Sequence, residues 1–175
     1  KGYTVTVFEK NEMAGGLLRY GIPNFKLAKN IVERRIDLMK EEGVIFKTGV
    51  QVDTLPEGFD AYCIAIGAEV PRDLPIEGRK LKGIHFAMEY LAQQNRLLES
   101  VPVAPETLIN AKGKKVLVIG GGDTGSDCVG TANRQKAIKI TQIEILDKPP
   151  VGYNPTTPWP SMYPQVLKTS SSHAE

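Results

Sequence analysis

The fold of this chain is decided by one stretch, which reads Val116-Leu117-Val118-Ile119-Gly120-Gly121-Gly122-Asp123-Thr124-Gly125. An apolar run leads into a G-x-G-x-x-G pattern, which predicts a buried strand, a tight turn and a helix reaching about Arg134. In such a turn the first glycine permits the bend, the second admits a pyrophosphate and the third lets helix and strand pack closely. The free N–H groups at the helix start attract phosphates. The stretch predicts a dinucleotide-binding site, and a purely structural turn is the alternative. The predicted site residues are Gly120, Gly121, Gly122, Asp123, Thr124 and Gly125.

An acid after the next strand is expected to bind the adenosine ribose. That strand is predicted over Thr141–Leu146 and is followed by Asp147 and Lys148. Asp147 lies 22 positions after Gly125, near the spacing of about 20 at which an acid accepts hydrogen bonds from the ribose. A carboxylate there repels the additional phosphate of NADPH, so Asp147 favours NADH. Lys148 and Arg134 could instead pair with that phosphate, which leaves NADPH open.

The N-terminal part repeats the pattern of strand, glycine-rich loop and helix. Thr4–Glu9 is rich in β-branched residues and predicts a strand, at whose end Glu9 is placed to bind a second ribose. Paired glycines, Gly15 and Gly16, follow and allow the backbone to approach a flat cofactor. Apolar residues then recur at helical spacing over 28–39, and Gly43 ends that helix.

The rest of the chain predicts further strands and one more helix. Short strands are expected at 44–46 and 50–52, and the helix at Phe86–Leu98. The continuous apolar run Ala61–Ile66 predicts a strand buried on both faces, with Cys63 as a small core residue. The order of elements predicts an α/β fold with parallel sheets.

Composition excludes several classes of protein. Of 175 residues, 24% are charged and 41% hydrophobic, and the net charge is +2, which argues against nucleic-acid and membrane partners. The two cysteines lie far apart, as expected of a reduced, cytoplasmic protein, with a plastid or other organelle left open. The motifs include no catalytic triad and no metal cluster. This suits hydride transfer, in which cofactors supply the reactive atoms and the protein supplies their position.

The chain resembles the glutamate synthase family, in the small (beta) subunit or the corresponding region of single-chain forms. The glycine-rich segments also resemble dihydropyrimidine dehydrogenase, whereas the proline-rich end is similar to glutamate synthase alone. The resemblance covers nearly the whole chain and is carried by Phe8–Lys10, Gly15–Leu27, Ala65–Ala68, Gly120–Cys128, Glu144–Leu146, Pro149-Pro150 and Pro158-Trp159-Pro160.

The resemblance implies a flavoprotein that passes hydride from NADH or NADPH to FAD. It implies two Rossmann-like domains, both incomplete in this chain: an FAD-binding domain at 1–69, without its first strand and glycine turn, and an NAD(P)-binding domain at 70–175. It implies that Glu9 holds the FAD ribose, that Leu17 lies beside the flavin, and that Lys26 is a basic residue near FAD. The backbone of Val52 would meet the adenine, and Gly67 belongs to the cofactor-binding set. Gly121–Thr124 would bind the nicotinamide dinucleotide. Iron–sulfur clusters are implied for the full-length protein outside this segment, and the implied partner is the glutamine-using large subunit or region.

Two departures from the family pattern matter. The parts of the FAD domain that precede Lys1 and follow Glu175 in the family are not in this sequence, so we expect the chain alone to bind FAD weakly. Lys136 stands where the relatives carry a glycine. Two alternatives remain: a flavin reductase module of the dihydropyrimidine dehydrogenase or ferredoxin-NADP reductase type, and a domain without activity.

Overall fold

The computed structural model describes residues 2–162 and 166–167 and divides the chain into two compact units, Lys1–Phe86 and Ala87–Glu175. We call them the N-terminal and C-terminal units. Each contains one pair of parallel strands and at least one helix, so the fold is mixed α/β as predicted. No helix among the described residues has the length and apolar character needed to span a bilayer.

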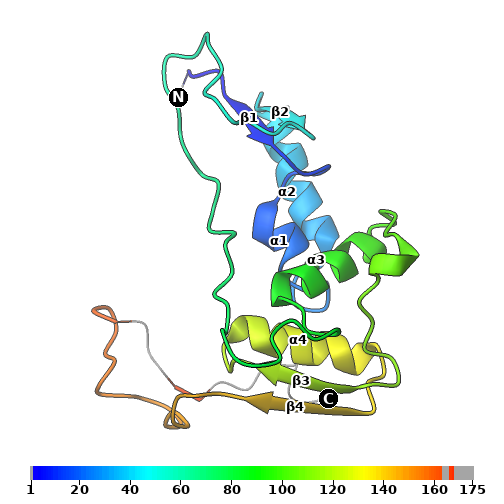
Figure 1. The fold of residues 1–175 in the computed structure, drawn as a ribbon. Helices are drawn as coiled ribbons and strands as arrows, with labels where there is room; N and C mark the ends of the chain where they lie inside the picture. The colour runs from blue at the N-terminus through cyan, green and yellow to red at the C-terminus, as the bar shows by residue number, and fades with distance from the viewer. Residues whose placement is uncertain (1, 163–165, 168–175) are drawn as a thin grey trace. The chain divides into compact units, whose positions relative to one another are not determined.

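The N-terminal unit is a β-α-β arrangement (Figure 1). Strand β1 (Thr6–Glu9) pairs in parallel with β2 (Ile45–Thr48), and Thr6 lies opposite Ile45. The short helix α1 (Gly16–Tyr20) and the longer α2 (Lys29–Glu41) connect the two strands. The predicted strand, helix and second strand are therefore confirmed, with small shifts in their bounds.

Two predicted strands of this unit are wrong. Residues 50–52 and 61–66 have no strand structure, although the backbone N–H of Val50 donates to the carbonyl of Glu9 at 3.0 Å. Ile66 is 79% exposed and Cys63 is exposed, so the run is not a buried core strand. The physical reason is that a strand needs a hydrogen-bonded neighbour, and the described sheet of this unit consists of β1 and β2.

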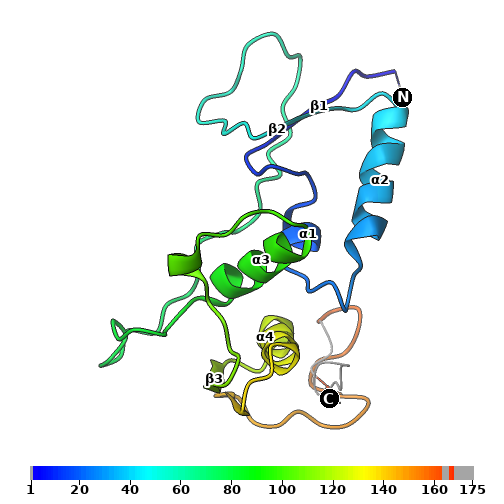
Figure 2. The same cartoon turned by 90° about the vertical axis from the view of Figure 1, so that its right-hand side faces the viewer.

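The C-terminal unit places its helices against one face of a second strand pair. Strand β3 (Lys115–Ile119) pairs in parallel with β4 (Lys139–Ile143), and α4 (Asp123–Arg134) connects them. Helix α3 (Ala87–Leu98) packs on α4, which lies against the strands (Figures 1 and 2). A short 3-10 helix, Pro105–Thr107, lies in the connection to β3. The core consists of Tyr90, Leu91, Val118, Cys128 and Val129.

The strands of the C-terminal unit are covered on one face only. Val116 and Val118 of β3 pack in or against the core, whereas Leu117 between them is 58% exposed. The strand predicted at 115–119 is confirmed, but it is buried on one face only. Alternate side chains of a strand point to opposite faces, and in the described chain helices cover only one of them. Strand β4 also ends at Ile143, three residues before the predicted end.

Candidate dinucleotide-binding site

The glycine turn follows β3 directly and is fixed by hydrogen bonds to β4. The N–H of Gly120 donates to the carbonyl of Ile143 at 2.8 Å. The carbonyl of Gly120 accepts a bond of 2.8 Å from the side-chain amide of Gln142. The φ angle of Gly120 is 118°, which lies in the region that favours glycine. The turn is thus held at both its backbone donor and its backbone acceptor.

The second and third glycines of the pattern have different surroundings. A Cβ atom built on Gly125 would lie 2.2 Å from the carbonyl oxygen of Gly120, so only glycine permits this close approach of helix and turn. A Cβ built on Gly122 would meet nothing within 4 Å. Packing therefore explains Gly125 but not Gly122, whose lack of a side chain leaves room outside the turn. This is the division of roles that dinucleotide binding requires.

The start of α4 supplies unpaired donors to the same space. Gly122 is the N-cap of this helix and has no side-chain cap, and the first intrahelical bond runs from Ser126 to the carbonyl of Gly122. Asp123 and Thr124 form the exposed first turn. Their backbone N–H groups and the helix dipole favour an anion at this end.

Sequence reasoning missed Glu144, the first residue after β4. Its carboxylate accepts hydrogen bonds from the backbone N–H groups of Gly121 and Ile145, both at 2.6 Å, and of Leu146 at 3.0 Å. The bonds from Leu146, Gly121 and Ile145 lower the pKa of this carboxyl group. Glu144 follows Gly125 by 19 positions. A sequence-based prediction that ended the strand at Ile143 would therefore have selected Glu144 by the same spacing rule.

The residues predicted to select the coenzyme lie in the segment after β4 or at the end of α4. Asp147 and Lys148 are exposed in the segment that follows β4. Arg134 donates from its guanidinium to the carbonyl of Gly130 in its own helix at 3.1 Å. The structure instead brings Glu144 into hydrogen bonding with the turn, through the N–H of Gly121.

The predicted flavin-side residues lie in the N-terminal unit. Glu9 ends β1 as predicted, and its carboxylate accepts bonds from the backbone and side-chain nitrogens of Asn11 at 2.8 and 2.7 Å. Gly16 begins α1 with a φ angle of 50° and has open space where a Cβ would lie. Leu17 follows it and is 61% exposed. The glycine pair and Leu17 thus offer an accessible backbone edge and an apolar side chain.

The remaining predicted residues are only partly brought together. Lys26 and Val52 are exposed, outside helices and strands. Gly67 has a φ angle of 71°, and Glu69 beside it forms an ion pair with Lys10. That ion pair ties the Gly67 segment to the residue after Glu9. The structure therefore associates the Gly67 segment with the end of β1.

Known proteins resemble this chain over most of its length. Residues 23–156 match the pyridine nucleotide-disulphide oxidoreductases, and the chain belongs to this family. Within it, the chain is 49% identical to the glutamate synthase [NADPH] small chain of Mycobacterium tuberculosis, over 99% of its own length and 37% of that protein. It is 46% identical to the glutamate synthase [NADH] of Schizosaccharomyces pombe, covering 99% of the chain and 9% of that protein. The resemblance to glutamate synthases is thereby confirmed.

A solved structure shows the same fold. A mutant of FprA from Mycobacterium tuberculosis superposes with a TM-score of 0.60 at 21% identity, covering 79% of this chain and 36% of that one.

The chain also matches the glutamate synthase [NADPH] small chain of Bacillus subtilis at 46% identity, over 36% of that protein's length. The chain thus spans little more than a third of the small chains that it resembles.

Proposed function

We propose that this chain takes part in hydride transfer from a nicotinamide dinucleotide to FAD, as the electron-input region of a glutamate synthase. The observation that carries the proposal is the glycine turn. Gly125 is required by its approach to Gly120, whereas Gly122 borders open space at an uncapped helix start. The relatives named as glutamate synthases support the choice of reaction. The bound cofactors supply the redox chemistry, in which hydride passes from the reduced nicotinamide to the flavin.

In the C-terminal unit, the protein's part is to hold the pyrophosphate. The backbone N–H groups of Asp123 and Thr124 donate to its oxygens, and the dipole of α4 stabilises their negative charge. The carboxylate of Asp123 is exposed at the start of the helix, where it also interacts favourably with the dipole. Gly122 contributes open space, Gly125 permits the close packing on Gly120, and the backbone N–H of Gly121 donates to Glu144.

In the N-terminal unit, we propose that the accessible residues meet FAD. Glu9 at the end of β1 holds a ribose, and Gly16 and Leu17 lie against the flavin ring. Support comes from the open space at Gly16 and the exposure of Leu17. The sequence-based roles of Lys26 beside FAD, Val52 at the adenine and Gly67 in the same site remain part of this proposal.

We further propose that Glu144 selects the coenzyme. It occupies the end of β4, where a carboxylate accepts hydrogen bonds from the ribose of NADH and repels the phosphate of NADPH. Its three backbone donors lower its pKa and keep it charged at neutral pH. Asp147 and Lys148, at three and four positions further on, are the alternative determinants. The relatives carry both coenzymes in their names, so kinetics must decide.

The proposed partner is the glutamine-using large chain or region, which would accept the electrons after the flavin. Relatives from bacteria are named as small chains, which supports a separate large chain in that arrangement. We propose a reducing, cytoplasmic setting, consistent with the free thiol on the exposed Cys63.

The dinucleotide site is tested by comparing two glycine substitutions. Gly122→Val fills the open space, so we expect NADH binding to the purified chain to be lost in calorimetry while the melting temperature is unchanged. Gly125→Ala is the control for packing. It should destabilise the chain by about 1–3 kcal/mol, because its Cβ would collide with Gly120. Equal NADH affinity in Gly122→Val and the unsubstituted chain would refute the site.

A further inference from the structure

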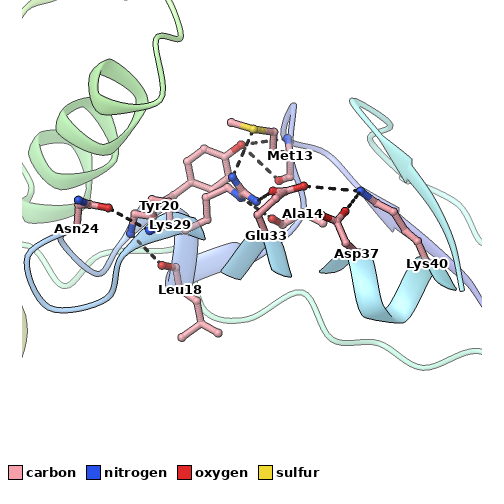
Figure 3. A network of polar contacts seen from close by, with 10 residues as sticks. Met13, Ala14, Leu18, Tyr20, Asn24, Lys29, Glu33, Asp37 and Lys40 are labelled. Carbon is pink, nitrogen blue, oxygen red and sulfur yellow. Dashed lines mark hydrogen bonds and ion pairs between the residues drawn. The ribbon is translucent and has the colours of Figure 1, made fainter. Parts of the chain in front are cut away.

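Three buried polar side chains surround the loop that carries the glycine pair of the N-terminal unit. Arg19 is 2% exposed, and Lys29 and Tyr20 are also buried. All three donate hydrogen bonds to backbone carbonyls of the loop or of the short helix α1 (Figure 3). Buried charged groups are costly to desolvate unless they are paired. Their concentration around one five-residue helix therefore calls for a specific reason.

Arg19 fixes the chain just before the glycines. Its Nε donates to the carbonyl of Ala14 at 2.7 Å, and another guanidinium nitrogen contacts the sulfur of Met13 at 3.4 Å. The same guanidinium forms an ion pair with Glu33 of α2 (Figure 3). A Cβ atom on Gly15 would lie 3.0 Å from the Cβ of Arg19, so the glycine and the arginine are packed together.

The other two side chains hold the loop on either side. The Tyr20 hydroxyl accepts from the N–H of Met13 at 3.1 Å and donates to its carbonyl at 3.3 Å. The ammonium of Lys29 donates to the carbonyls of Leu18 at 3.0 Å and Ile22 at 2.5 Å. Backbone is thus anchored both before and after the glycine pair, while Gly16 itself has no neighbour where a Cβ would lie.

We propose that Arg19 is a positioning residue that holds Gly15, Gly16 and Leu17 in the backbone shape that meets the flavin. The inference rests on the proposed function of the N-terminal unit. Helices of five residues are unstable on their own, so α1 depends on its anchors. A preorganised loop binds a rigid ring without losing further conformational entropy. Arg19 acts through the carbonyl of Ala14 and through Glu33 rather than by contact with the cofactor.

The test compares Arg19→Met with Arg34→Met, which makes the same chemical change on an exposed arginine of α2. The full chain is titrated with FAD, and amide hydrogen exchange is followed by mass spectrometry. We expect Arg19→Met to weaken FAD binding on the order of tenfold and to speed exchange at residues 13–18 by a similar factor. Arg19→Lys retains one donor and should restore part of both effects, whereas Arg34→Met should change neither.

Three results would overturn the inference. One is unchanged FAD affinity in Arg19→Met. Another is faster exchange throughout β1, β2 and α2 to the same degree as at 13–18, which would mark Arg19 as a general stabiliser. The third is an equal effect of Arg34→Met. We expect the unsubstituted chain to bind FAD weakly but measurably; if it binds no FAD at all, the proposed flavin role of the N-terminal unit fails first, and this result is visible before any variant is compared.

Discussion

Cys63 and Cys128 lie in opposite environments. The sequence placed Cys63 in an apolar run and predicted a core residue, but the residue is exposed. Cys128 is buried in the core of the C-terminal unit beside Tyr90 and Val129. Burial, with a smaller contribution from the carboxylate of Asp127, raises the pKa of its thiol to about 12. An apolar neighbourhood in the sequence therefore did not predict the burial of an individual side chain.

The first prediction concerns the reactivity of these thiols. At pH 8, Ellman's reagent should modify Cys63 in the folded chain and leave Cys128 intact, because the thiolate is the reactive form and burial suppresses it. After unfolding, both should react. Cys63→Ser should abolish the fast reaction, while Cys128→Ala should leave it unchanged. Rapid modification of Cys128 in the folded chain would contradict its burial.

The second prediction concerns the effect of Glu144 on the choice between NADH and NADPH. Glu144→Gln removes the charge but keeps a side chain that can accept hydrogen bonds. We expect this change to raise the preference for NADPH, measured as the ratio of the dissociation constants of NADH and NADPH, by roughly tenfold. This factor corresponds to the removal of about 1.4 kcal/mol of repulsion between Glu144 and the phosphate of NADPH. Any loosening of the turn at Gly121 affects both coenzymes alike and cancels in the ratio.

Asp147→Asn is the matched control, since it tests the acid that the spacing in the sequence favours. It should leave the ratio unchanged. If Asp147→Asn shifts the ratio and Glu144→Gln does not, the structural assignment is wrong and the sequence-based one holds. The lowered pKa of Glu144 means that its charge is retained as the pH falls toward the ordinary range for a glutamate. The preference for NADH should accordingly persist in mildly acid buffer.

Helices α2 and α4 end in the same way. After α2, Gly43 has a φ angle of 94°, and Val44 donates to the carbonyl of Met39 at 2.9 Å. After α4, Lys136 takes the same place with a φ angle of 63°, and Ala137 donates to Ala132 at 3.1 Å. This pattern is the Schellman motif, in which the left-handed residue is usually glycine. The left-handed conformation of Lys136 is the physical reason to expect a glycine at this position, as the resemblance implied.

The third prediction follows from that comparison. Lys136→Gly should stabilise the C-terminal unit by about 1 kcal/mol, because glycine adopts the left-handed conformation without the steric cost of a side chain. Gly43→Ala is the opposite change at the equivalent position of α2 and should destabilise by a similar amount. Thermal unfolding followed by circular dichroism measures both. Stabilisation absent in Lys136→Gly would mean that the lysine side chain makes a compensating contribution.

The predicted elements differ in how much the sequence could specify them. The helices α2, α3 and α4 were predicted to within a few residues because periodicity and stop signals are local properties. The run 61–66 has the composition of a buried strand, but composition does not specify which strand would pair with it. Arg19 and Lys29 could not be predicted as buried, because cations are ordinarily exposed and their partners here are backbone carbonyls that sequence does not reveal.

At the scale of the whole molecule, the two units are joined by a long stretch without helix or strand. Between β2 and α3 the described chain forms no regular element, and Arg72, Lys80 and Lys82 are exposed. Local contacts do occur there, since Arg79 pairs with Asp73 at 2.5 Å and lies over the ring of Phe86. These contacts connect neighbours in sequence. They leave the segment accessible to a protease, which needs an extended, exposed backbone.

The last prediction joins this architecture with the proposed site. Brief trypsin digestion should cleave first after Arg72, Lys80 or Lys82 and release fragments that correspond to the two units. Saturating NADH should then slow further digestion of the fragment that carries α4, because a ligand that binds only the folded state stabilises it. The N-terminal fragment should be unaffected by NADH, and Gly122→Val should remove the protection. Mass spectrometry identifies the cuts. First cleavage within α2 or α4, or equal protection of both fragments, would contradict the division into units or the placement of the NADH site.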